Sequence, residues 1–407
     1  MNTIRQNFRQ WWQPPRRLAD REEDRSVTFL ELFYDLVYVV IVAELAHALA
    51  GDISWAGVGR FAFLFIVVWW AWWNGTSYHD LHGNNDIRTR VFTFLQMGTV
   101  AAMAVFAHNA MGEGSTGFAL SYAAFQFILL YLWWRSGVHD PAHRPLSQPF
   151  VAGYLLTTLL FVGSVFFAEP VRFYLWGAAL LLSLLLPATM FMVGRDDPEI
   201  QAQIDLSTAV SPSLVERFGL FTIIVLGEVI VGTVGGLAEH HHLDFQVGLT
   251  GALGMLIAVG LWWLYFDFIS HHKPLPSRNM VFAWFYLHLP MTIGIVGVGA
   301  AVLNIVEHAG EHLPGEARWL LVGALALVLV TITLLMHTIQ YPNENRRIYN
   351  AGGWSALISA VVIALLGITN LEIMPLLIIV ILLLLAPVFY SFRVWIEMLG
   401  AEEIPLS

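Results

Sequence analysis

The stretch VTFLELFYDLVYVVIVAELAHAL, residues 27–49, decides the fold class of this chain. It is long enough to cross a bilayer as one helix, because about 20 apolar residues suffice. The same stretch carries four ionisable side chains, Glu31, Asp35, Glu44 and His47. Each would cost about 2.5–3.5 kcal/mol at the centre of a membrane helix unless it is paired or faces protein or water. The stretch therefore predicts a membrane helix that makes polar contacts with its neighbours.

The rest of the chain has the composition of a multi-pass membrane protein. Its 407 residues are 57% hydrophobic, and the mean hydropathy is +0.65. Apolar stretches of roughly 20 residues recur along the whole chain, so we predict an all-α protein with twelve membrane helices. The expected spans are 27–49, 56–77, 88–108, 117–138, 149–168, 172–193, 213–236, 245–269, 280–303, 317–339, 353–369 and 373–395.

The basic residues predict how the helices are oriented. Lys and Arg are retained on the cytoplasmic side of a membrane. With the N-terminus inside, all but three of the 20 Lys and Arg residues fall on that side, the exceptions being Arg60, Arg172 and Arg318. We therefore expect both termini in the cytoplasm. Residues 1–26 contain two Trp and six Arg, which predicts an arm on the anionic inner leaflet or, alternatively, simple positive-inside anchoring.

The two halves of the chain are related to each other. Six first-half residues recur in the same order and at the same spacing in the second half: Trp72, Trp73, His82, Arg88, Val91 and Phe92 return as Trp262, Trp263, His272, Arg278, Val281 and Phe282. Six helices per half, an even number, make the repeat parallel. We predict a basic arm at 1–26, a six-helix repeat at 27–193, a cytoplasmic linker at 194–212 and a second six-helix repeat at 213–407.

Polar residues inside the predicted spans are the candidate functional groups. Glu31 and Asp35 share one helix face, and Glu44 and His47 share a roughly opposite face. One hypothesis is a proton or cation pathway, because carboxylates and histidines can relay protons within a membrane. Its candidate residues are Asp35, Glu44, His47, Gln96, Glu228 and His288.

The competing hypothesis is structural. Carboxylates can pair with Arg217, His47 or a Trp indole and simply join helices, at about 0.6 kcal/mol per bond on average. The two roles stay open for Asp35, Glu44 and Glu228. A structural or capping role is the expectation for the remaining polar residues singled out in or beside the spans, Glu31, Glu216, Arg217 and Asp267.

Other kinds of site are not expected from the sequence. The run His240 to His242 lies in a predicted outer loop, where contiguous histidines do not guarantee the fixed geometry of a metal site. The chain has no Cys, which excludes disulfides and thiolate ligands, and it has no P-loop, dinucleotide-binding or hydrolase motif. We expect no metal, no cofactor and no nucleic-acid partner. Membrane lipids and a proton or small cation are the expected partners, and a second copy of the chain stays open.

The strings VTFLELFYDLVYVVIVAELAHAL and ERFGLFTIIVLGEVIVG resemble the bacterial low temperature requirement protein A (LtrA) family over nearly the whole chain. The hallmarks of that family are an ELFFDLVFV-like first helix and an ERFGLFVIIxLGE-like later helix. The matching positions are Glu31, Phe33, Asp35, Glu216, Arg217, Phe218, Gly219, Gly227 and Glu228. The resemblance implies a multi-spanning bacterial membrane protein, which we expect in the inner membrane, and it supplies no reaction.

A second resemblance concerns the first helix alone. FYDLVYVV at 33–40 is similar to the FSDAVFAI segment of the endolysosomal potassium/proton channel family, in which helices 1 and 7 line the pore. Here Tyr34 replaces the Ser of that motif, and Leu220 stands where Asp35 would recur in the second half. The sequence thus favours a transport protein for a proton, a small cation or a proton-coupled solute. The alternatives are a non-transport accessory or assembly protein of the envelope and, third, a membrane enzyme with a His/Glu metal site.

Overall fold

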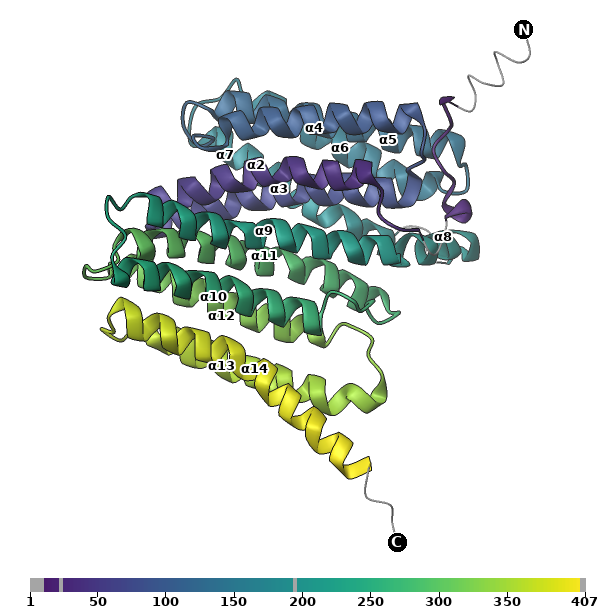
Figure 1. The fold of residues 1–407 in the computed structure, drawn as a ribbon. Coiled ribbons are helices and arrows are strands. Elements are labelled where there is room, and N and C mark those ends of the chain that lie inside the picture. The colour runs from purple at the N-terminus through teal and green to yellow at the C-terminus, as the bar shows by residue number, and fades with distance from the viewer. Residues whose placement is uncertain (1–10, 22–24, 193–195, 403–407) are drawn as a thin grey trace. The chain divides into compact units, whose positions relative to one another are not determined.

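The computed structural model describes residues 11–21, 25–192 and 196–402. Within these ranges the regular structure is helical, apart from an isolated bridge between Pro274 and Ile339 (Figure 1). The α-helices are α2 (Phe29–Gly51), α3 (Trp55–His82), α4 (Ile87–Ala107), α5 (Ser115–His139), α6 (Arg144–Ser164), α7 (Val171–Leu185), α8 (Pro198–Thr208), α9 (Pro212–Ala238), α10 (Phe245–Phe268), α11 (Arg278–Glu307), α12 (Gly315–Met336), α13 (Arg346–Leu366) and α14 (Ile373–Glu402). Three short 3₁₀ helices complete the list: η1 (Leu18–Asp20), η2 (Leu186–Phe191) and η3 (Asn343–Asn345).

Among the described residues, 11 helices are long and apolar enough to cross a membrane. They correspond to the second through twelfth predicted spans. The first predicted span corresponds to α2, which has 23 residues and a length of about 35 Å. That length exceeds the thickness of a bilayer core, and the crossing of α2 remains a prediction.

The structure differs from the predicted spans and linker at several helix ends. Helix α3 continues past residue 77 to His82, so that a polar string becomes helical. Helix α7 ends at Leu185 and the chain continues as η2, because Pro187 has no N–H to donate and its ring disfavours a continuing α-helix. The predicted linker contains α8, whose N-cap Asp197 accepts hydrogen bonds from the N–H groups of Glu199 and Ile200.

The helices form two compact units, one of residues 1–45 and 63–214 and the other of residues 46–62 and 215–407. In the first unit, α5 packs against α4 and α6, and α6 packs against α7. In the second unit, α12 packs against α11 and α13, while α14 packs against α13 and α10. Residues 46–62, which comprise the end of α2, the loop and the start of α3, belong to the second unit.

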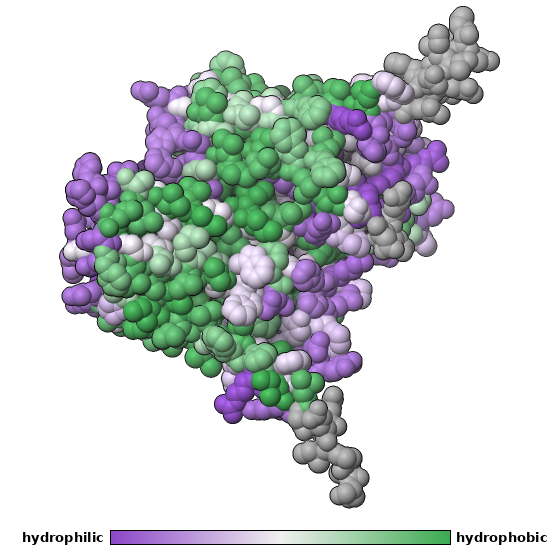
Figure 2. Space-filling view, viewed as in Figure 1, coloured by the Kyte–Doolittle hydropathy of each residue, from purple (hydrophilic) through white to green (hydrophobic). Residues whose placement is uncertain are grey.

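The long helices expose apolar side chains on one face. In α6, Tyr154 and Thr157 are buried, whereas Leu155, Leu156 and Leu159 are 47–58% exposed. Figure 2 shows hydrophobic side chains along the helices of the visible face and hydrophilic ones gathered toward the helix ends. Such apolar faces match the hydrocarbon core of a bilayer, because there they are not exposed to water and the free-energy cost of hydrating apolar surface is avoided.

Candidate functional site

Glu31 lies in the first turn of α2 and is 4% exposed. Its Oε2 accepts hydrogen bonds from the backbone N–H and the hydroxyl of Thr28, both at 2.9 Å. The Thr28 Oγ1 accepts in turn from the Glu31 N–H at 3.3 Å, and Arg25 forms an ion pair with the other carboxylate oxygen. This reciprocal pattern is a capping box, so Glu31 stabilises the start of α2.

Asp35 lies one turn further along α2 and is 1% exposed. Its Oδ1 accepts a hydrogen bond from the Trp72 indole N–H of α3 at 2.8 Å. Beside it, the hydroxyls of Tyr34 and Tyr38 are 3.0 Å apart, and a Cβ at Gly75 would lie 2.0 Å from the Tyr34 hydroxyl. The absence of a side chain at Gly75 thus lets α2 and α3 approach closely where Asp35 and Trp72 meet.

Glu44 and His47 lie toward the other end of α2. Glu44 is half-buried and His47 is exposed. Both side chains are more accessible than Asp35, which is 1% exposed. Glu44 belongs to the first unit and His47 to the second, because the division falls after residue 45.

Gln96 of α4 is fully buried in the first unit. Neither its amide oxygen nor its amide nitrogen has a hydrogen-bond partner among the described residues. One turn away, the Thr93 hydroxyl donates to the Thr89 carbonyl at 2.8 Å, so it accepts from the His79 Nε2–H at 3.3 Å. A buried amide without partners costs about 1–3 kcal/mol, which makes Gln96 a candidate ligand for an ion or a water molecule.

Glu228 of α9 is 4% exposed and lies where α9 and α11 approach each other. A Cβ at Gly232 would be 2.3 Å from the Gly299 carbonyl oxygen. A Cβ at Gly299 would be 2.8 Å from the backbone carbonyl of Glu228, and one at Gly236 would be 2.8 Å from the Leu303 carbonyl oxygen. Gly232 and Gly236 form the small-xxx-small pattern that allows close helix packing in membranes.

The Glu228 carboxylate has no hydrogen bond or ion pair within the described ranges of the chain. It therefore contrasts with Glu31 and Asp35, which both bond to neighbouring groups. An ionised carboxylate without a partner is costly to bury. A bound proton or cation would remove that cost.

His288 of α11 is fully buried and has both ring nitrogens engaged. Nδ1 donates to the Trp284 carbonyl at 2.7 Å, so in the neutral ring Nε2 accepts from the Tyr265 hydroxyl at 3.2 Å. The imidazole also contacts the ring of Phe218, with centroids 4.5 Å apart. Eleven residues of α11 separate His288 from Gly299, the neighbour of Glu228, which is about 16 Å along the helix. Glu228 and His288 therefore do not share one binding site.

The remaining motif residues lie at different depths. Glu216 is exposed at the start of α9, whereas Arg217 is fully buried. Asp267 is exposed on α10 and accepts a hydrogen bond from the Trp263 indole at 2.6 Å.

A cluster around Asp80 was not predicted from the sequence. Asp80, at the end of α3, is 3% exposed, and its Oδ1 accepts from the hydroxyls of Ser211 at 2.6 Å and Ser213 at 3.1 Å. Arg21 forms an ion pair with the other oxygen, and Arg16 donates to the Asp80 backbone carbonyl at 2.5 Å. The Asp80 cluster thus joins α3, the arm and the linker between the halves.

The described part of the arm therefore packs against protein. The Leu18 N–H donates to the Asp140 carboxylate at 3.2 Å, and the Gln13 N–H donates to Asp86 at 2.9 Å. Trp11 and Trp12 remain 63% and 38% exposed. Arg17 is exposed as well. These exposed side chains fit the predicted leaflet contact, whereas the backbone beside them is bonded to residues at the ends of α3, α4 and α5.

A second unpredicted feature is a pair of buried histidines, His82 and His143, whose ring centroids are 4.8 Å apart. The His82 Nδ1–H donates to the Arg16 carbonyl at 3.0 Å. Among the described residues, His82 Nε2 and both nitrogens of His143 have no hydrogen-bond partner. Burial lowers the pKa of His143 to about 4, although the Asp140 charge partly opposes the shift.

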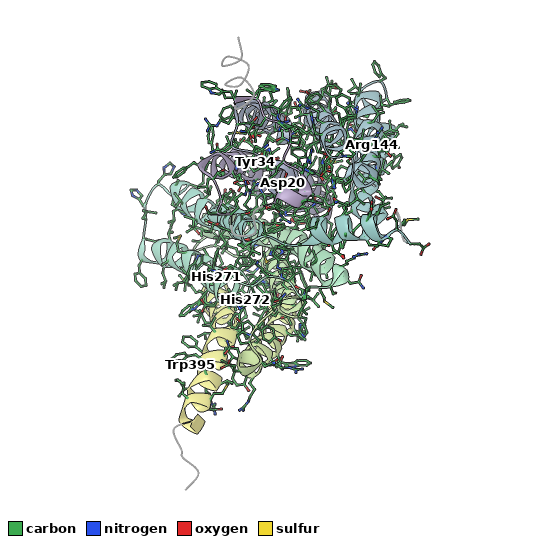
Figure 3. All side chains as sticks on the ribbon, turned by 90° about the vertical axis from the view of Figure 1, so that its right-hand side faces the viewer. Asp20, Tyr34, Arg144, His271, His272 and Trp395 are labelled. Carbon is green, nitrogen blue, oxygen red and sulfur yellow. The ribbon has the colours of Figure 1, made fainter. Side chains whose placement is uncertain are left out.

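The second unit has a related contact. His272, the counterpart of His82 in the repeat, shares a 2.9 Å hydrogen bond with the Tyr349 hydroxyl near the start of α13. Burial, with a contribution from the adjacent His271, lowers the pKa of His272. His271 and His272 are labelled in Figure 3, on the segment that follows α10. In both units a histidine at or just after the end of one long helix, α3 or α10, thus lies against the beginning of another, α6 or α13.

No group of three metal-ligating side chains occurs in the part of the chain that the structure describes. Of the outer histidines, His240 donates its Nε2–H to the Val306 carbonyl at 2.8 Å, and His241 and His242 are exposed. His240 therefore has a local structural contact.

The long apolar helices, their exposed apolar faces and the buried carboxylates between them define a multi-pass, all-α membrane protein. Residues 26–389 match the family model described as bacterial low temperature requirement A protein (LtrA), and the chain belongs to this family. It is also 29% identical over 303 residues to an uncharacterized protein of Rhizobium meliloti (strain 1021), covering 68% of this chain and 69% of that protein. No solved structure matches the chain.

Proposed function

We propose that this protein moves a proton or another small cation across the bacterial inner membrane, and that Glu228 is the group that binds it. The observation that carries the proposal is a carboxylate, 4% exposed in a 27-residue apolar helix, with no partner in the described residues. A side chain with only a structural role would be expected to have a partner, because an isolated buried charge is destabilising. A group that alternately binds and releases a cation must keep its oxygens available.

Gln96 and Asp35 are the proposed supporting groups in the first unit. The Gln96 amide offers a free oxygen in a fully buried position, and Trp72 orients Asp35 through its indole N–H. Glu44 and His47, which are more accessible, are proposed as an entrance at the far end of α2. His288 is the weakest candidate on the pathway, because both of its ring nitrogens are already engaged.

The test measures ion flux through purified protein in liposomes, with a pH-sensitive dye and a panel of cations. We expect Glu228→Gln to reduce flux at least tenfold while the protein still inserts and keeps its melting temperature, since the amide retains the shape but cannot alternate its charge. The matched control is Glu216→Gln, an exposed carboxylate on the same helix, which should keep wild-type flux. Wild-type flux and pH response in Asp35→Asn, Glu44→Gln and Glu228→Gln together would contradict the pathway.

The second candidate function is an accessory or assembly protein of the cell envelope. The capping role of Glu31 and the Asp35–Trp72 hydrogen bond favour it, since both place carboxylates in structural contacts. This alternative predicts no flux above empty liposomes for the wild-type protein. It also predicts that Asp35→Ala lowers the melting temperature, whereas Asp35→Asn, which can still accept from Trp72, preserves it.

A further inference from the structure

The second unit contains an apolar groove of about 410 Å³ between the end of α2, the start of α3 and the helices α11 and α12. Gly294 and Gly297 of α11 and Gly323 of α12 are among its lining residues. At Gly294 the two helices touch, since a Cβ there would be 2.7 Å from the Val328 side chain. At Gly323 the space is open, because no atom lies within 4 Å of where a Cβ would be.

The shape of the groove fits a hydrocarbon chain. On α12 it extends from Glu316 to Leu327, eleven residues or about 16 Å along the helix. Trp55 and Trp319 line it and are 85% and 43% exposed. Because α3, α11 and α12 are all long and apolar enough to cross a membrane, the open side of the groove faces lipid. In a bilayer, the long apolar molecule at hand is an acyl chain.

The mouth of the groove has the chemistry to select a head group. Glu316, in the first turn of α12, is exposed and has no ion pair in the described part of the chain. The nearby Arg60 of α3 is paired with Asp52, so it is not a free cation for a phosphate. Trp319 follows Glu316 by three residues on α12, which places both on one helix face. Trp55 also lines the groove, and aromatic rings attract cations. A carboxylate with aromatic neighbours complements an ammonium group and repels a head group with a net negative charge.

We propose that this groove binds one acyl chain of a phospholipid with a primary-amine head group, and that the ammonium binds Glu316. The proposal is independent of cation transport. It predicts that the protein retains phosphatidylethanolamine more strongly than phosphatidylglycerol.

The first experiment fills the groove. Purified protein is equilibrated with vesicles of equal phosphatidylethanolamine and phosphatidylglycerol content, and the lipid retained after delipidating washes is counted by native mass spectrometry. Gly323→Phe should reduce retained phosphatidylethanolamine at least fivefold, and Gly323→Leu should reduce it less. The matched control is Gly248→Phe, at an exposed position of α10 with no atom within 4 Å, which should retain lipid as the wild type does.

The second experiment tests the head group. Glu316→Gln should still bind one phospholipid but lose the preference for phosphatidylethanolamine. The wild-type protein retaining both lipids equally would overturn the assignment of the head group. Unchanged retention in both Gly323→Phe and Gly323→Leu, with melting temperatures showing that the variants are folded, would overturn the assignment of the groove itself.

Discussion

At the scale of single residues, the buried carboxylates differ in what surrounds them. Asp35 and Glu228 are both almost fully buried in apolar helices. Asp35 bonds to an indole N–H, whereas the Glu228 side chain meets no donor in the residues that the structure describes. The contrast separates a contact that joins two helices from an oxygen pair that can bind a cation, because only unengaged lone pairs can coordinate without first breaking a bond.

His143 carries a prediction of pH dependence. Its pKa is about 4 in the folded protein and 6.5 ordinarily, mainly because burial disfavours the charged ring. Between pH 6.5 and 4 the unfolded chain therefore binds more protons, and stability falls as the pH falls, by about 3 kcal/mol at the lower limit. His143→Phe keeps an aromatic ring against Trp133 but cannot titrate.

The melting temperature in detergent, measured from pH 7.5 to 4.5, tests this. The wild-type value should decrease on acidification and the His143→Phe value should decrease less. Some slope should remain, because the protein contains other titratable groups. Equal slopes for the two proteins would show that His143 is not protonated on unfolding.

At the scale of elements, the glycines of α9 and α11 determine how closely these helices pack. Gly232 and Gly299 face each other so closely that neither position leaves room for a Cβ. The sequence signal for this contact is the GTVGG string at 232–236, which indicates close packing but does not identify the partner helix. The partner, α11, is evident only from the tertiary structure.

Gly299→Ala should destabilise the second unit by about 1–3 kcal/mol, since overpacking of a tight contact forces the backbones apart. The Cβ would press on the backbone of Glu228, so flux should also fall if Glu228 binds the cation. Gly248→Ala, on the exposed face of α10 with open space around it, is the control and should be neutral. The measurement is the melting temperature of the wild type, Gly299→Ala and Gly248→Ala under the same conditions. Equal values for all three would contradict the tight contact at Gly299.

Helix ends were the least predictable elements. Pro187 stops α7 early, and this was missed because hydropathy alone does not register the missing N–H. The linker helix α8 was also missed, although Asp197 followed by Pro198 is a helix-start signal. The capping box of Thr28 and Glu31, in contrast, is local to four residues of sequence.

At the scale of the whole molecule, the topology is the prediction most open to direct test. Both termini and the linker at 194–212 should face the cytoplasm, because with twelve spans almost all the basic residues fall at the termini and in every second loop. Reporter fusions should show cytoplasmic activity after residue 200 and periplasmic activity in the loop at 239–244. Periplasmic activity at residue 200 would contradict this topology, through either an N-terminus outside or an odd number of crossings in the first half.

By itself, the sequence determined that this chain is an all-α multi-pass membrane protein of the LtrA family, with helices close to the predicted positions. These features depend on local composition and length, since each apolar segment satisfies its own backbone hydrogen bonds. Only the tertiary structure decided which polar groups meet. The Trp72–Asp35 bond joins residues 37 apart and the Ser211–Asp80 bond joins residues 131 apart. Such pairs depend on which helices pack together. The hydrophobic effect has no preferred direction, so the apolar pattern of a helix does not specify its neighbour.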